Sequence, residues 1–231
     1  MTRTLRTMKL HLTAWPSWAG WPWTIMASSL LLNILIAARI DEPAGEQQQT
    51  GGMLALMFVL LFSGIQPMTQ IHPFAAALAV TRRRFAIATG LFVLGTSLLY
   101  GAVLYLAGLV EDATGGWGVD LAFFRLDFLL VDDPLLQILV YAGPLLAIVA
   151  VGAFAGVMHA RCGPNGLFVT GLGWVVLIGG ILASIAWTDS WGTVGDWLSD
   201  ASPVLLLAAI PAAVAAALAA ATWGVLRRTT P

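Results

Sequence analysis

Long apolar runs separated by short polar stretches dominate this chain. A bilayer core about 30 Å thick needs roughly 20 apolar residues per helix, and six runs approach or exceed that length. They cover residues 21–38, 52–69, 86–109, 135–159, 167–187 and 203–226. The pattern predicts an all-α, polytopic membrane protein with six transmembrane helices, organised as a single transmembrane domain over residues 1–231.

The charged residues divide by sign between the two sides of the predicted membrane. All 12 Asp and Glu residues fall on one side, and nine of the 11 Lys and Arg residues fall on the other, with Arg39 and Arg125 as exceptions. Because Lys and Arg are retained in cytoplasmic loops, we expect both termini in the cytoplasm and the protein in the inner (plasma) membrane. A composition of 59% hydrophobic and 10% charged residues gives no support to nucleic-acid binding.

Two further patterns concern segments next to the spans. Residues 1–14 are predicted to form an amphipathic interfacial helix on membrane lipids, because Leu5, Met8 and Leu12 recur at helical spacing among basic residues. The apolar run 121–131 is too short and too charged to span, so we expect it to lie at the outer surface.

Small and polar residues inside the spans predict how the helices pack. Gly152 and Gly156 have the spacing that lets two helix backbones approach closely. Gln137 and Tyr141 are interpreted as interhelical hydrogen-bond partners, with the lining of a path for an amphiphilic substrate as the alternative. The adjacent pair Glu111 and Asp112 is expected to be solvated charge or a loose cation site.

The segment between the second and third spans is apolar at first and then carries Arg82, Arg83 and Arg84. Three arginines at the bilayer centre would cost on the order of 8–10 kcal/mol, so the segment has to turn back at the inner surface. Pro67 and Pro73 are expected to break the preceding helix. A short helix over residues 72–85 is then predicted, with one apolar face made of Phe74, Leu78, Thr81 and Phe85.

This arrangement resembles the cytoplasmic coupling helix of bacterial ABC permeases of the type-2 (export) family. Those proteins commonly carry a stretch from Pro-Phe to (Ser/Thr)-Arg-Arg-x-(Phe/Tyr) between the second and third spans. The residues that carry the resemblance here are Pro73, Phe74, Leu78, Thr81, Arg82, Arg83 and Phe85. The six spans, the basic N-terminal helix and the chain length are also similar, whereas the long outer segment after the third span departs from the family.

The resemblance implies a transmembrane permease subunit of an ATP-driven exporter that moves a hydrophobic or amphiphilic compound, such as a drug, a lipid or a small peptide. A separate ABC ATPase subunit would bind ATP and Mg²⁺, and a second copy of this chain or a related permease would complete the transporter. The residues implied at the contact with the ATPase are Phe74, Leu78, Arg82, Arg83 and Phe85.

Missing motifs narrow the alternatives. No G-x-x-x-x-G-K-[ST] occurs, so the chain has no ATPase site of that kind and no cofactor of its own is expected. The middle of each span lacks Asp, Glu, Lys and Arg, which disfavours proton coupling. His11, His72 and His159 form no H-E-x-x-H motif, and an enzyme is not expected. The alternative function is a non-transporting membrane assembly or immunity subunit. The two differ in whether residues 82–84 contact an ATPase partner.

Overall fold

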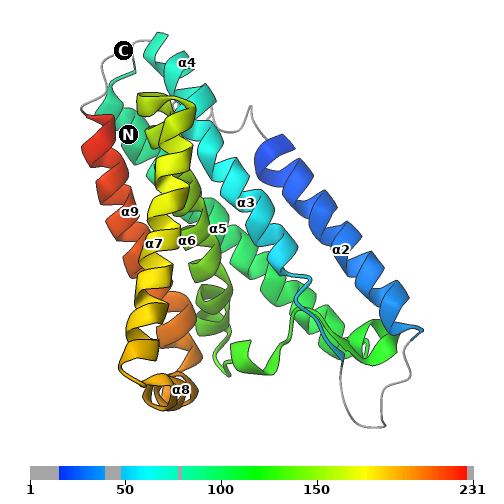
Figure 1. Cartoon of the computed structure of the whole chain (residues 1–231). Coiled ribbons are helices and arrows are strands. Elements are labelled where there is room, and N and C mark those ends of the chain that lie inside the picture. The colour runs from blue at the N-terminus through cyan, green and yellow to red at the C-terminus, as the bar shows by residue number, and fades with distance from the viewer. Residues whose placement is uncertain (1–15, 40–47, 78–79, 228–231) are drawn as a thin grey trace.

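The computed structural model describes residues 16–39, 48–77 and 80–227 (Figure 1). Within these residues, six helical segments are long and apolar enough to cross a membrane. They are Pro16–Ala37, Leu54–Ala75, Arg82–Ala113, Pro134–Cys162, Pro164–Trp187 and Leu205–Leu226. The chain therefore folds as an all-α, multi-pass membrane protein, as its hydropathy predicts, whereas the helix expected over residues 1–14 lies outside the described residues.

Short π-helical turns divide several spans into more than one element. In order, the spans contain η1 (Pro16–Gly20) with α2 (Trp21–Ala37), α3 (Leu54–Gln66) with η2 (Pro67–Ile71) and α4 (His72–Ala77), α5 (Arg82–Ala113), α6 (Pro134–Cys162), α7 (Pro164–Trp187), and η5 (Leu205–Ala209) with α9 (Ile210–Leu226). Outside the spans lie β1 (Gln48–Gln49), η3 (Gly116–Asp120), β2 (Leu121–Ala122), the 3-10 turn η4 (Asp127–Leu129) and α8 (Trp191–Asp200).

Three of the π-helical turns each end two residues before a proline. η1 is followed by Pro22, η2 by Pro73 and η5 by Pro211. A proline ring clashes with the carbonyl group four residues earlier and has no N–H group, so a wider preceding turn relieves the clash without ending the helix. The second span accordingly stays helical through Pro67 and Pro73 as far as Ala77, and the expectation that these prolines break the helix is wrong.

The break occurs further along, between α4 and α5. Val80 and Thr81 are not helical, and Thr81 has extended backbone angles of φ −68° and ψ 144°. The helix predicted over residues 72–85 is therefore interrupted: its first part continues the second span, and its last part begins the third. Phe74 and Phe85 consequently lie on different helices and do not share one helical face.

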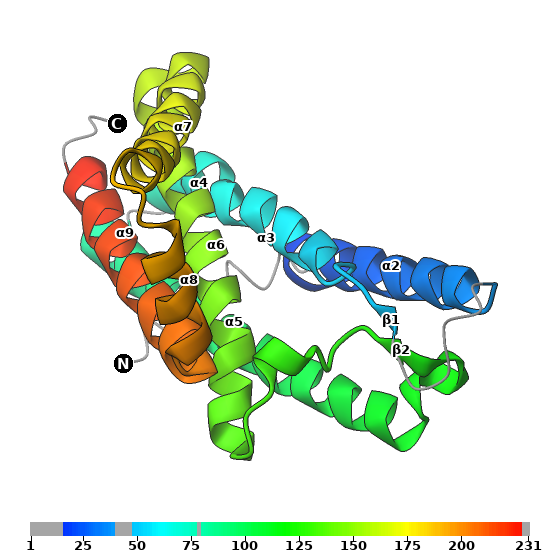
Figure 2. The ribbon, with the colours of Figure 1, turned by 60° about the horizontal axis from the view of Figure 1, so that its bottom comes forward.

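Helix α6 lies at the centre of the bundle and packs against α3, α5, α7 and α9 (Figure 2). Glycines make the closest approaches to α3. A Cβ atom added to Gly152 would collide with the carbonyl oxygen of Leu61, and one added to Gly64 would lie 2.5 Å from that of Val149. A Cβ atom at Gly156 would lie 2.7 Å from another α3 carbonyl oxygen. The predicted close packing through Gly152 and Gly156 is confirmed.

The two ends of the bundle differ in charge. Figure 1 shows the α4–α5 turn, the α6–α7 turn and the end of α9 together, and this basic end carries Arg82, Arg161 and Arg227. The opposite, acidic end carries every described Asp and Glu, at the end of α5, before α6 or around α8. Helix α8 lies across the acidic end, viewed along its axis in Figure 1, with Trp191 and Trp197 about half exposed, as is typical of an interfacial helix.

The apolar run 121–131 folds back into the acidic end of the bundle, and we call it the re-entrant segment. Phe123 is fully buried, and Phe124 accepts a hydrogen bond at its carbonyl oxygen from the Tyr141 hydroxyl of α6, at 2.8 Å. Strand β2 pairs in parallel with β1, and the pair lies between α2 and α5 (Figure 2). The expectation of a surface segment is wrong, because Phe123 and Phe124 complete the core at this end, although Phe128 stays exposed.

Large apolar side chains cover the outside of the bundle, most fully on α7. Phe168 is 77% exposed, Leu172 is 64% exposed and Val175 is 68% exposed. A soluble protein rarely exposes so much contiguous apolar surface, but lipid tails are as apolar as these side chains. The surface is therefore that of a protein whose surroundings are a bilayer.

Replacing Gly152 by alanine is expected to destabilise the bundle by roughly 1–3 kcal/mol, because the new methyl group would collide with the α3 backbone. The matched control is Gly179→Ala in α7, where an added Cβ atom meets nothing within 4 Å. Alanine's better helix propensity predicts an unchanged or slightly higher stability there, by up to about 1 kcal/mol. Thermal unfolding in mild detergent measures both, and equal midpoints for the two variants would contradict this packing.

Candidate functional site

The turn between α4 and α5 is the first candidate site, because it places basic and apolar side chains together at the basic end. Thr81 caps α5: its hydroxyl oxygen accepts a hydrogen bond from the backbone N–H of Arg84, at 3.4 Å. The three arginines 82–84 therefore occupy the first turn of α5, where the helix dipole is positive. Each cation there is unfavourable by about 0.3–1 kcal/mol. Their position thus opposes helix stability and points to a role outside the helix.

The side chains predicted to contact an ATPase differ in how accessible they are. Phe74 is 57% exposed, and Arg83 is exposed on the first turn of α5. Arg82 is only half-buried, and its guanidinium donates a hydrogen bond to the carbonyl oxygen of Arg227 at the end of α9, at 3.2 Å. Leu78 lies outside the described residues. The structure therefore leaves Phe74 exposed before the α4–α5 turn and Arg83 exposed after it, and Arg82 ties the start of α5 to the last span.

Phe85 has a different position from the one expected. It is 1% exposed and lies in a buried cluster with Ala75 of α4, Val157 of α6 and Leu226 of α9. Its ring also meets the ring of His72 edge to face, with centroids 5.1 Å apart. The prediction that Phe85 lies on a docking surface is wrong, because the α4–α5 turn folds it inward, where it links α4 to two spans.

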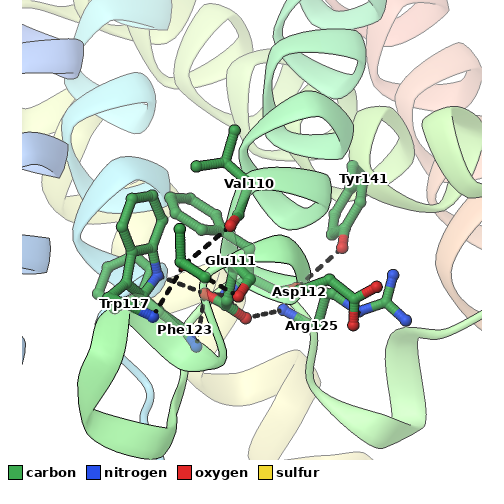
Figure 3. Close-up of polar contacts among 9 residues, drawn as sticks. Val110, Glu111, Asp112, Trp117, Phe123, Arg125 and Tyr141 are labelled. Carbon is green, nitrogen blue, oxygen red and sulfur yellow. Dashed lines mark hydrogen bonds and ion pairs between the residues drawn. The ribbon is translucent and has the colours of Figure 1, made fainter.

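The second candidate site is at the acidic end and centres on Glu111, which sequence reasoning treats as solvated. Glu111 is only 3% exposed. Figure 3 shows its carboxylate facing Trp117 and Phe123. Its carboxylate accepts hydrogen bonds from the indole N–H of Trp117 at 2.8 Å and from the backbone N–H groups of Phe123, Phe124 and Arg125 at 2.8–3.2 Å. A carboxylate only accepts hydrogen bonds, so Glu111 satisfies four donors at once and fixes the start of the re-entrant segment.

Backbone geometry between Glu111 and the re-entrant segment depends on glycine. Gly115, Gly116 and Gly118 all have φ between 60° and 75°, and Trp117 shares this left-handed conformation with φ 62°. An aromatic residue there is strained, typically by about 1–3 kcal/mol, which the bond from its indole to Glu111 offsets. The glycines that follow Glu111 in the sequence therefore indicate a tight turn here.

The far end of the re-entrant segment is held by α6. The Gln137 side chain accepts a hydrogen bond from the backbone N–H of Val131 at 2.7 Å and donates one to the carbonyl oxygen of Leu129 at 3.0 Å. Asp133 caps α6, since its carboxylate accepts from the backbone N–H groups of the first turn. Gln137 and Tyr141 therefore make hydrogen bonds to this segment, and the prediction that they bond to another spanning helix is wrong.

Beneath the re-entrant segment lies a cavity of about 460 Å³. Its walls come from α3, α6 and the re-entrant segment, with Met57, Leu129, Val140 and Leu145 among the lining residues. Polar groups at its border are already engaged, since Tyr141 donates to Phe124. The volume lies within the range of about 300–1,000 Å³ typical of small-molecule sites, and the lining suits an apolar compound.

In the described part of the chain, no group of three or more His, Cys, Asp or Glu side chains is placed to hold a metal ion. Among the same residues, the ion pair at 3.5 Å between Arg125 and Asp112 is the only one.

No family model, curated protein or solved structure matches the chain. Its function is therefore argued from the geometry of these sites.

Replacing Glu111 by glutamine is expected to destabilise the protein by roughly 1–3 kcal/mol, because the amide NH₂ group cannot accept hydrogen bonds and leaves a buried N–H donor without a partner. The adjacent control is Asp112→Asn, which removes an exposed ion pair worth about 0–1 kcal/mol. Unfolding in detergent measures the stabilities, and limited proteolysis reports loosening of the acidic end. Equal effects of the two substitutions would show that Glu111 does not organise this segment.

Proposed function

We propose that this protein is the transmembrane subunit of an ATP-driven exporter, similar to the type-2 ABC permeases, and that a separate ATPase subunit docks at the α4–α5 turn. The observation that carries the proposal is the turn itself. It presents an exposed aromatic residue, Phe74, and an exposed cation, Arg83, at the basic end, and the same turn is anchored inside the bundle. Aromatic residues and arginine are enriched at the energetic centre of protein interfaces.

The anchoring supports a coupling role, because a displacement of the turn would act on several spans together. Phe85 packs against Val157 of α6 and Leu226 of α9. Arg82 holds the last carbonyl groups of α9, with hydrogen bonds to Leu226 and Arg227. Packed side chains transmit displacement because close-packed interiors deform little. Movement of α4 by a partner would therefore shift α6, which borders the apolar cavity below the re-entrant segment. It would also shift the last span, which reaches the same cavity through Leu207 of η5.

The cargo proposed is a hydrophobic or amphiphilic compound. The cavity of about 460 Å³ has an apolar lining, and its border lies at the acidic end, on the predicted outer side. The spans carry no Asp, Glu, Lys or Arg near their middles, since Glu111 lies at the outer end of α5. Energy from an attached ATPase fits these spans better than energy from proton binding within them.

The substitution Arg83→Glu is expected to reduce recovery of the ATPase subunit at least tenfold when the tagged protein is purified from its native membrane in mild detergent. A reversed charge would face the partner across the interface, and like charges there are strongly unfavourable. The matched control is Arg161→Glu, which makes the same change at an exposed position of the same end, on α6. Quantitative mass spectrometry of the eluate identifies a P-loop ATPase and measures its amount.

The substitution Phe74→Ala tests the apolar part of the proposed docking surface. The control is Phe168→Ala on α7, which makes the same substitution at another exposed phenylalanine. Only the first substitution is expected to weaken recovery of the ATPase, by about tenfold or more. If the unaltered protein brings down no P-loop ATPase, or if both members of each pair behave alike, the permease assignment fails. The non-transporting membrane subunit would then be the better interpretation.

A further inference from the structure

A second cavity lies in the basic half of the bundle, between α5, α6 and α9, and measures about 270 Å³. Alanines on one face of α9 form its outer wall, with Ala212, Ala215, Ala216 and Ala219 at helical spacing. The facing walls are equally apolar and include Val93 of α5. Short side chains on α9 thus leave room for a guest of narrow cross-section.

One polar group in the wall of this cavity lacks a partner. Thr222 lines the cavity and is 7% exposed, and its hydroxyl oxygen is buried without a hydrogen-bond partner among the described residues. A threonine in a helix usually donates its hydroxyl hydrogen to the carbonyl group one turn earlier. Leaving a buried hydroxyl unbonded is unfavourable by about 1–3 kcal/mol. A guest with a hydrogen-bond acceptor, such as an ester carbonyl, would satisfy it.

Positive charge borders the cavity at its end nearest the surface. Leu226 lines the cavity, and its carbonyl oxygen accepts a hydrogen bond from Arg82 at 3.5 Å. Arg227 follows directly on α9 and is exposed. Within the described part of the chain neither arginine has a carboxylate partner, because every described acidic residue lies at the other end. Arginines without carboxylate partners at a membrane surface favour anionic headgroups.

We propose that this cavity binds a membrane phospholipid with an anionic headgroup, taken from the leaflet at the basic end. One acyl chain occupies the space beside the α9 alanines, its ester lies near Thr222, and the phosphate lies near Arg82 and Arg227. The inference is independent of the proposed transport function, since it requires only that the protein is embedded in a bilayer.

The test uses the full-length protein, delipidated in mild detergent, and native mass spectrometry with dioleoylphosphatidylglycerol or dioleoylphosphatidylcholine added. We expect one phosphatidylglycerol to bind per chain, at least fivefold more tightly than phosphatidylcholine. Ala216→Phe, which fills the cavity, should weaken this binding at least tenfold. Ala217→Phe is the matched control, because that position on α9 is exposed and does not line the cavity.

Two further variants separate the contributions of the hydroxyl and the charge without changing volume at the cavity wall. Thr222→Val keeps the shape and removes the hydroxyl, with an expected loss of about threefold. Arg227→Gln should lower the affinity for phosphatidylglycerol about fivefold and leave that for phosphatidylcholine unchanged. Equal effects of Ala216→Phe and Ala217→Phe would overturn the site. Equal affinity of the unaltered protein for the two lipids would overturn the assignment of an anionic headgroup.

Discussion

The fold depends on how closely other backbones can approach α6. Inside a bilayer the burial of apolar side chains gives little driving force, so helices associate through van der Waals contact and a few hydrogen bonds. Gly152 and Gly64 allow α3 and α6 to meet backbone to backbone over their basic halves. Gly101 does the same for α5, since a Cβ atom there would lie 2.5 Å from the carbonyl oxygen of Ile138. Where no such glycine pair occurs, towards the acidic end, α3 and α6 border a cavity.

The hydrophobic pattern predicts the six spans, and the glycine spacing predicts that α6 approaches another helix closely, because both signals are local in sequence. That the partner is α3 is visible only in the structure. The α4–α5 turn was predicted less well. Helical spacing from Phe74 to Phe85 assumes one continuous helix, and the extended backbone at Thr81 removes that assumption. Proline in the sequence likewise predicts a helix break, whereas a π-helical turn before Pro73 accommodates its ring and lets the helix continue.

Glu111 shows why a buried polar site is difficult to predict from adjacent residues. A carboxylate beside Asp112 on a predicted outer loop has the pattern of a solvated pair. Its four donors belong to residues 117–125, and they converge only when the glycine-rich turn reverses the chain. The sequence signal for this site is the glycine-rich turn at residues 115–118, followed by the apolar run 121–131. That run is too short to span the membrane, so its side chains are buried only by packing into the bundle.

The bonds made by Glu111 also bear on how the bundle assembles. A carboxylate cannot rest in hydrocarbon unbonded, and its partners follow it in the chain by only six to 14 residues. The bonds of Glu111 can therefore form as soon as α5, α6 and the segment between them are in place. That hairpin contains α6, the helix against which α3, α7 and α9 each pack, so it offers these spans a common contact surface. Packing of the bundle would thus be organised by a hairpin from the middle of the chain.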